Sequence, residues 1–211
     1  MPAGLQSVFA DLHRGFSTLG VRWYVFGAQA VIAAGVPRFT ADVDVTVELP
    51  PGGSRRLLSV LGRRFSLQKL RNAEAFIEQA RVIPLVHRST DIPVDVVLAG
   101  PGLEEEMLAR VQLRRVGARL EIPFVATTDL VALKVLAGRD KDLEDVRALL
   151  RAKPAELSVA KVRAALRRIG ALLDDSTLLE TFEVQVRHAR SRPSRAQARA
   201  KRTRSARSRP G

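Results

Sequence analysis

Residues 23–47 read WYVFGAQAVIAAGVPRFTADVDVTV, and this stretch decides the fold that we predict. Its first four residues are a short apolar run, which is typical of a buried strand. Gly27 opens a run of good helix formers that Gly35 closes, and Pro37 then breaks the chain. Residues 42–49 alternate as a strand does. The stretch therefore predicts a strand, a helix and a second strand in close succession.

Two carboxylates share one face of the second predicted strand. Residues two apart in a strand project to the same side, so Asp42 and Asp44 lie together while the neighbouring valines point to the core. Adjacent carboxylates repel each other, and a hard divalent cation with oxygen ligands, Mg²⁺ or Mn²⁺, removes that repulsion. The alternative interpretation is a solvated polar face on an edge strand, and the D-x-D pattern taken alone favours it.

The glycine that joins the first strand to the helix is a candidate phosphate contact. Such a junction aims backbone N–H groups and the positive end of a helix dipole at an anion. Gly27 lacks a side chain that would keep a phosphate from the backbone. A simple turn is the alternative interpretation of a single glycine in this position.

Asp95 is a third carboxylate, within the β-rich run 93–98. A carboxylate among β-branched apolar residues is unfavourable if it is buried without a partner. On a strand beside the D-x-D strand, Asp95 would complete a three-carboxylate metal site with Asp42 and Asp44. On a half-exposed strand it would simply face solvent. The three aspartates together are a stronger signal than any one of them.

The rest of the chain predicts an α+β fold in which the texture changes to helix near residue 125. Strand-like runs predict two hairpins, over residues 81–98 and 111–122, and Pro84 argues against a central place for the first of these strands. Helical spacing and helix formers predict helices over residues 5–19, 54–61, 72–80, 103–109, 130–137, 142–151, 159–173 and 177–188. We therefore expect a catalytic domain over 1–125, a helical domain over 126–188 and a basic tail over 189–211.

The order of residues in and after the first helix carries a family resemblance. The matching residues are Gly27, Ala28, Gly35, Arg38, Thr40, Asp42 and Asp44. They resemble the signature of the nucleotidyltransferase (polymerase-β-like) superfamily, in which a Gly-Gly or Gly-Ser pair at a helix start precedes D-x-D. Within it the chain most resembles the AbiEii/MenT-type toxins of bacterial toxin–antitoxin systems, which also place an arginine and a threonine ahead of D-x-D. Ala28 departs from the pair because it lacks a serine hydroxyl.

A later stretch, residues 132–146, resembles the K-L-x-A…R-D-x-x-D motif of the same toxin group. The matching residues are Lys134, Arg139, Asp142 and Asp145. We expect Lys134 to reach across a cleft toward a triphosphate. The other three either form a charge cluster that fixes a helix pair or make an ordinary surface network, and the surface network is favoured over a catalytic role.

The resemblance implies a nucleotidyltransferase fold, a mixed sheet with flanking helices, and an enzyme that transfers a nucleotidyl group from an NTP to an acceptor hydroxyl. Pyrophosphate would be released. Asp42, Asp44 and Asp95 would be the catalytic residues and would hold Mg²⁺, as two ions. The residues expected to bind the nucleotide and its phosphates are Gly27, Ala28, Arg38, Thr40 and Lys134.

The acceptor that the resemblance implies is RNA, with a tRNA 3′ end preferred, and a cognate antitoxin is an expected partner. From His188 to the C-terminus the chain has nine lysines or arginines and no acidic residue. This segment therefore contributes most of the net charge of the whole chain, which is +13. This tail suits phosphate backbones and should be disordered in isolation, although a solubilising role is the alternative. Two other functions stay open: a small-molecule, aminoglycoside-like nucleotidyltransferase, and a catalytically inactive nucleotide- or RNA-binding module.

Composition narrows the chemistry further. The chain has no cysteine, so disulfides, thiolate metal sites and thiol nucleophiles are excluded. No stretch reaches the ~18 apolar residues that a membrane-spanning helix needs, and the N-terminus lacks the pattern of a signal peptide. We expect a cytoplasmic protein without membrane contacts.

Overall fold

The computed structural model describes residues 2–68, 73–118 and 120–191, with the backbone alone at positions 73 and 74. Within these ranges the strands are β1 (Trp23–Phe26), β2 (Val43–Val47), β3 (Phe65–Leu67), β4 (Val82–His87), β5 (Pro93–Leu98), β6 (Gln112–Val116) and β7 (Leu120–Phe124). The helices are α1 (Ala3–Leu19), α2 (Gly27–Ala33), α3 (Ser54–Leu61), α4 (Ala73–Ala80), α5 (Leu103–Leu108), α6 (Thr127–Ala137), α7 (Asp140–Ala152), α8 (Val159–Leu173) and α9 (Thr177–Arg190). The predicted α+β fold is confirmed. Residues 72 and 192–211, where a helix start and most of the basic tail were predicted, lie outside the described ranges.

All seven strands join one mixed sheet in the order β3-β4-β5-β2-β1-β7-β6. The central strand β2 runs antiparallel to β1 and parallel to β5, and β1 runs parallel to β7. The valines of β2, at positions 43, 45 and 47, are fully buried as the alternation predicted. The D-x-D segment therefore belongs to the centre of the sheet, and the edge-strand alternative is wrong.

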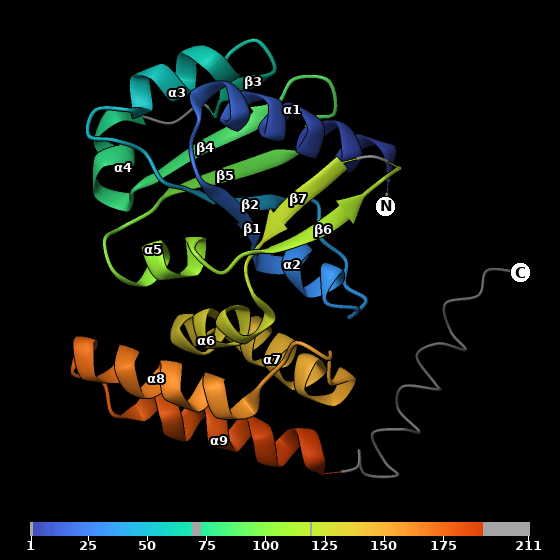
Figure 1. The fold of residues 1–211 in the computed structure, drawn as a ribbon, viewed down its shortest axis with the longest axis vertical. Coiled ribbons are helices and arrows are strands. Elements are labelled where there is room, and N and C mark those ends of the chain that lie inside the picture. The colour runs from blue at the N-terminus through green and yellow to red at the C-terminus, as the bar shows by residue number, and fades with distance from the viewer. Residues whose placement is uncertain (1, 69–72, 119, 192–211) are drawn as a thin grey trace, which may run out of the picture.

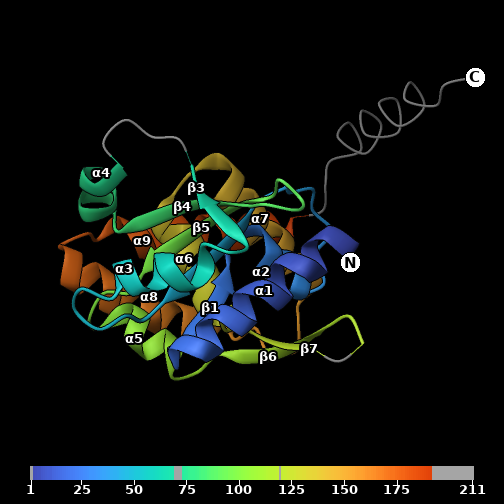
Figure 2. The ribbon, with the colours of Figure 1, turned by 90° about the horizontal axis from the view of Figure 1, so that it is seen from above.

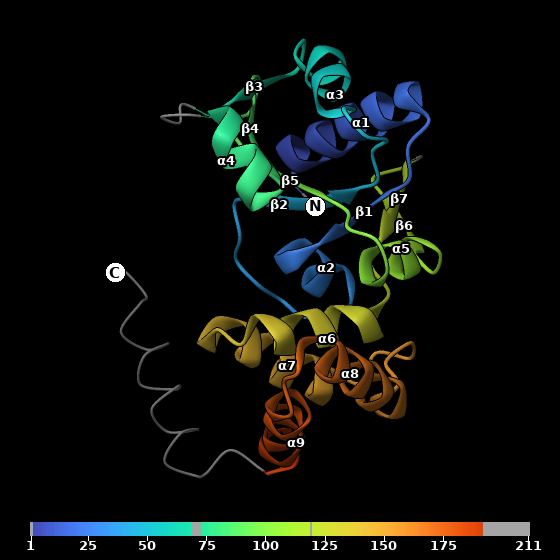
Figure 3. The ribbon, with the colours of Figure 1, turned by 90° about the vertical axis from the view of Figure 1, so that its left-hand side faces the viewer.

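Helices cover both faces of the sheet (Figure 1). Helices α1 and α3 lie across one face, as the view from above also shows (Figure 2). On the other side lie α2 and then the group α6 to α9, which forms a helical layer of its own (Figure 3). The carboxyl end of β1 and the start of α2 thus lie between the sheet and the helical layer.

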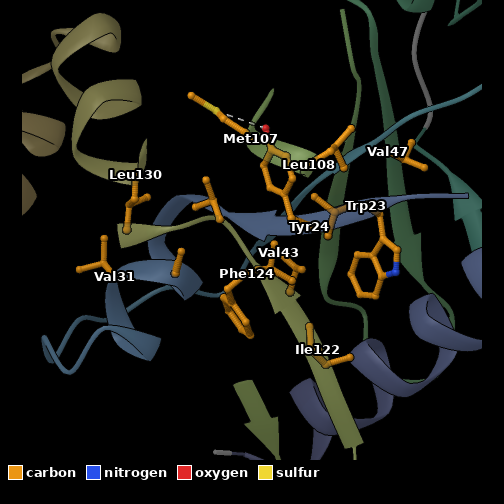
Figure 4. Close-up of a cluster of buried hydrophobic side chains, with 14 of the residues drawn as sticks. Trp23, Tyr24, Val31, Val43, Val47, Met107, Leu108, Ile122, Phe124 and Leu130 are labelled. Atoms are coloured by element: carbon orange, nitrogen blue, oxygen red, sulfur yellow. Dashed lines mark hydrogen bonds between the residues drawn. The ribbon is translucent and has the colours of Figure 1, made fainter. Parts of the chain in front are cut away.

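The two faces of β1 show how the core is shared between these layers. Trp23 packs toward α1, where its ring centroid lies 4.8 Å from that of Phe16. Tyr24 points the opposite way and its hydroxyl lies 3.8 Å from the sulfur of Met107 in α5 (Figure 4). Both side chains are buried, as expected for the buried strand that the apolar run predicted.

An ion pair ties the helical layer to the sheet half. The guanidinium of Arg110 binds both carboxylate oxygens of Asp129 at the start of α6, at 2.7 and 3.0 Å. Asp129 is buried, and a bidentate arginine pair satisfies a buried carboxylate well. A second pair, Arg168 with Glu106, joins α8 to α5. These contacts, together with α2 against α6, fix the helical layer below the sheet.

One strand placement differs from the prediction. Pro84 lies in β4, which is an inner strand because the short strand β3 pairs with its outer side. The residue pairs with β3 end at Leu85, and the carbonyl of Pro84 accepts a hydrogen bond from the backbone N–H of Gln68 at 2.9 Å. A residue without an N–H group is tolerated there because the ladder ends beside it. The sequence analysis missed β3, which has only three residues.

Among the described residues, no helix has both the length and the apolar character required to cross a bilayer.

The core predicts a contrast between two leucines. Leu12 in α1 is 0% exposed, whereas Leu172 in α8 is 76% exposed. We expect Leu12→Ala to lower the free energy of unfolding by about 2–5 kcal/mol, because the cavity left behind removes packing contacts. Leu172→Ala, the matched control, should change it by less than about 0.5 kcal/mol. Urea denaturation checks both values, and equal losses would contradict the described packing.

Candidate active site

The structure brings two of the predicted carboxylates into direct register. Asp44 of β2 and Asp95 of β5 are paired residues on neighbouring parallel strands. On its other side Asp44 pairs with Phe26, the last residue of β1. Asp42 comes immediately before β2, one residue outside the strand. The aspartates therefore gather where β1 ends and α2 begins.

Gly27 makes room for the carboxylate of Asp44. A Cβ atom placed on Gly27 would overlap Asp44 Oδ2 and lie 2.8 Å from its Cγ. The φ angle of Gly27 is +62°, in the left-handed region that residues with a side chain rarely adopt. Glycine is thus required here twice, for the backbone and for the space. The need for glycine was predicted from the sequence, but the space beside it was expected to hold a phosphate and instead holds the Asp44 carboxylate.

The electrostatics of the three aspartates show that they act on one another. Burial raises the pKa of Asp44 to about 6, and the nearby charges of Asp42 and Asp95 add to the shift. Burial also raises the pKa of Asp95, with a further contribution from Asp42. The positive charges of Lys134 and Arg139 act in the opposite direction on Asp44. The site therefore has an excess of negative charge, and the two cations offset only part of it.

The side chain of Asp42 is engaged elsewhere. Its carboxylate accepts a hydrogen bond from the hydroxyl of Thr40. Its backbone carbonyl accepts one from Nε2 of Gln29, at 3.1 Å. In the described part of the chain, no three acidic, histidine or cysteine side chains are arranged, as they stand, to hold a metal ion together. The hydrogen bond from Thr40 uses one acceptor site on the Asp42 carboxylate, which has about four in all.

Gln29 is a positioning residue that the sequence analysis missed. It is buried in α2, and its amide fixes the backbone just before the D-x-D strand. The available signal was one amide side chain within an otherwise apolar helix of alanine, valine and isoleucine. A buried amide requires hydrogen-bond partners, which the sequence alone does not identify.

Lys134 lies in a buried charge cluster between α6 and α7. Its Nζ atom lies 2.9 Å from Asp142 Oδ1 and 2.7 Å from Asp145 Oδ2. Arg38, in the segment that leads to β2, also pairs with Asp145. Asp142 and Asp145 are buried, so the predicted surface network is wrong and the predicted charge cluster that fixes the helix pair is confirmed. The ion pairs with Lys134, Arg38 and Arg139 compensate the charge of the two buried carboxylates.

The cluster shifts the titration of its members. Burial lowers the pKa of Lys134, although the hydrogen bond to Asp142 favours the charged form. Burial alone would raise the pKa of Asp142, but hydrogen bonds from Arg139 and Lys134 hold it below its usual value. Arg139 also differs from Lys134 in access, because its side chain is 63% exposed. Arg139 is thus the solvent-accessible cation of this group.

The remaining predicted residues lie around the aspartates. Ala28 is in the first turn of α2, directly after Gly27, and is buried. Arg38 and Thr40 stand in the segment between α2 and β2, which descends toward α6 and α7 (Figure 3). This segment, residues 34–42, is called the strap below. The predicted residues thus lie where the carboxyl end of β1 faces the helical layer, with Lys134 and Arg38 in the charge cluster between α6 and α7.

Solved structures similar to this chain share its fold. The solution structure of the antibiotic-resistance factor ANT(2'')-Ia is 15% identical, with a TM-score of 0.52, over 82% of this chain and 97% of that chain. A crystal structure of ANT(2'')-Ia in complex with adenylyl-2''-tobramycin is 14% identical, with a TM-score of 0.51, over 78% of this chain and 97% of that chain. An antigenic nucleotidyltransferase-like protein from Paracoccidioides brasiliensis is 14% identical, with a TM-score of 0.50, over 84% of this chain and 92% of that chain. No protein-family model matches the sequence, and no curated protein does.

These likenesses show the fold: the chain has the nucleotidyltransferase fold, as predicted. At such low identities they establish the fold, and the chemistry must be argued from the site itself.

Gly27 and Gly35 form a matched pair for testing the close approach of Asp44. Both have positive φ angles, but a Cβ on Gly35 would meet nothing within 4 Å. Gly35→Ala should therefore lose about 1–2 kcal/mol of stability from backbone strain alone. Gly27→Ala should lose about 1–3 kcal/mol more, because Asp44 must also move. Equal losses in urea denaturation would show that the carboxylate does not occupy this space.

The raised pKa of Asp44 predicts a pH-dependent stability. Its folded pKa of about 6 exceeds the usual aspartate value of 3.8, so the folded state binds this proton more tightly than the unfolded state. The resulting stabilisation is present below about pH 4 and is lost as pH rises through 6. With a chelator present, the free energy of unfolding of Asp44→Asn should exceed that of the wild type by up to about 3 kcal/mol at pH 8. This difference should shrink toward pH 5. Asp91→Asn, at an exposed hairpin position, is the control; a constant difference for Asp44→Asn contradicts the assignment.

Proposed function

We propose that the protein is a Mg²⁺-dependent nucleotidyltransferase that uses an NTP to modify an acceptor hydroxyl. The observation that carries the proposal is the pairing of Asp44 with Asp95 beside Gly27, with the pKa of both carboxyls raised. Structural aspartates are usually paired with cations. Here burial raises the pKa of both carboxyls, and neighbouring carboxylates add to it: Asp42 and Asp95 for Asp44, and Asp42 for Asp95. Strongly perturbed groups in such a cluster are typical of functional sites.

The donor set fits a hard divalent cation, Mg²⁺ or Mn²⁺. It consists only of carboxylate oxygens, which such ions prefer, and its excess negative charge is what a cation would compensate. Asp42, Asp44 and Asp95 are the proposed ligands of two ions. When bound, the ions would neutralise charge that develops on the triphosphate as pyrophosphate leaves.

The chain's own groups supply the proton transfer and orientation. The oxygen of the acceptor hydroxyl forms a bond to the α-phosphorus of the NTP. The bond between this phosphorus and the oxygen that bridges the α- and β-phosphates breaks, and pyrophosphate leaves. Asp95 accepts the proton of the attacking hydroxyl, a role that its raised pKa favours. Gly27 and Ala28 offer backbone N–H groups to the phosphates.

Three cations, Lys134, Arg139 and Arg38, have separate roles in this proposal. Lys134 was predicted to reach the triphosphate, but its ammonium is held by Asp142 and Asp145, so contact with a phosphate requires it to leave one of them. Arg139 is exposed and acts electrostatically on Asp44, so it is the cation best placed to meet a phosphate first. Arg38, paired with Asp145, holds the strap beside the site.

The proposed acceptor is RNA, at a tRNA 3′ end, and the proposed role is that of a toxin with a cognate antitoxin. The resemblance to AbiEii/MenT-type toxins supports this, and so does the basic composition of residues 189–211. The division into a catalytic domain over 1–125 and a helical domain over 126–188 belongs to the same proposal. A small-molecule acceptor is the second candidate, supported by the likeness to ANT(2'')-Ia.

A transfer assay tests the proposal. Purified protein with Mg²⁺ is given each α-³²P-labelled NTP and either total tRNA or an aminoglycoside such as tobramycin. Label should enter tRNA, and Asp42→Asn, Asp44→Asn and Asp95→Asn should each lower the rate at least about 100-fold, as should EDTA. Asp91→Asn is the matched control that should keep the wild-type rate.

The outcomes separate the candidate functions. Undiminished transfer by Asp44→Asn would refute the carboxylate mechanism. Label in tobramycin instead of tRNA would select the small-molecule function. NTP binding without any labelled product would favour the inactive binding module. Truncation after His188 should weaken the binding of an RNA acceptor and reduce the salt dependence of that binding. The binding of a small-molecule acceptor should not change.

A further inference from the structure

Phe39 is the most exposed large apolar side chain in the described part of the protein, at 103% relative exposure. The other exposed large apolar side chains lie between 37% and 76%. Burying a phenylalanine side chain is favourable, so a ring in full contact with water is a candidate binding surface. Single exposed apolar residues are common, however, and the case for Phe39 depends on where and how it is held.

Both neighbours of Phe39 are anchored. Arg38 pairs with Asp145 in α7, and the hydroxyl of Thr40 donates to the carboxylate of Asp42. The strap is therefore fixed on either side of the ring, to the helical layer and to the catalytic carboxylates. These anchors display the ring in solvent three residues from Asp42, beside the site.

We propose that Phe39 is a stacking platform for a nucleobase of the substrate; this inference rests on the proposed nucleotidyl transfer. The site already offers carboxylates for cations and the exposed guanidinium of Arg139 for phosphate. Phe39 adds a flat apolar face, which is the group that a nucleotide substrate needs for its base. Every base has a π face, so stacking fits the base of the NTP or the terminal base of an RNA acceptor. An aminoglycoside has no aromatic ring to stack.

Fluorescence of the full-length Phe39→Trp variant tests for stacking directly. Trp23, the one native tryptophan, is buried and gives a constant background in wild type. With Mg²⁺ present, ATP, GTP, CTP or UTP, or a short single-stranded RNA, should quench the new emission. Inorganic triphosphate, which has phosphates but no base, should not quench it.

Affinity measurements distinguish the effect of the aromatic face from the effect of apolar volume. Phe39→Tyr keeps an aromatic face, whereas Phe39→Leu keeps apolar volume without one. We expect Phe39→Leu to bind its base-bearing ligand about 5- to 100-fold more weakly than Phe39→Tyr. Both variants should melt at the wild-type temperature, because the position is fully exposed. A loss confined to the NTPs identifies the donor base as the partner, and a loss confined to the RNA identifies the acceptor base.

The proposal is overturned if triphosphate quenches as strongly as the NTPs, if neither NTP nor RNA quenches, or if Phe39→Leu and Phe39→Tyr bind both ligands within twofold of each other. These binding results do not depend on turnover. Failure of the proposed function would instead appear as undiminished transfer by Asp44→Asn, so the two failures are distinguishable.

Discussion

The carboxylate of Asp44 fills the space where a side chain at position 27 would begin, and the local architecture follows from this contact. Strand β1 must end at Phe26, and the chain must turn into α2 through a left-handed glycine. Strand β2 must also hold its register, since a slip by one residue would bring a valine to the site and turn Asp44 into the core. The buried valines on the opposite face of β2 oppose such a slip.

This arrangement stores unfavourable electrostatic energy in the middle of the sheet. Paired aspartates on neighbouring strands destabilise the folded state at neutral pH, as the raised pKa of Asp44 indicates. The helical layer offsets part of this, because Lys134 and Arg139 both lower the proton affinity of Asp44. The α6–α7 pair is therefore coupled to the carboxylates by charge, although its own hydrogen bonds go to Asp142 and Asp145. Such local instability is expected where a site must bind a charged ligand.

The sequence could predict what local pattern determines, and it failed where distant residues meet. Period-two and helical spacing identified most elements, and the alternation around Asp44 identified its face correctly. Pro84 is tolerated in an inner strand because the β3 ladder ends beside it, and this depends on tertiary structure. The partners of Gln29 and of Arg38 lie in other elements, 13 residues away for Gln29 and in α7 for Arg38, so no local pattern could reveal them. Motif resemblance placed Lys134 near the site but did not show that its ammonium is already paired.

The strap makes the two halves of the site interdependent. The Asp42 carboxylate, which accepts the hydrogen bond of the Thr40 hydroxyl, is also a proposed cation ligand, so Thr40 and a bound cation would share it. On the other side of Phe39, the ion pair of Arg38 with Asp145 holds the strap to the helical layer. Occupation of the carboxylates is thereby linked, through one hydrogen bond, to the position of the exposed ring of Phe39.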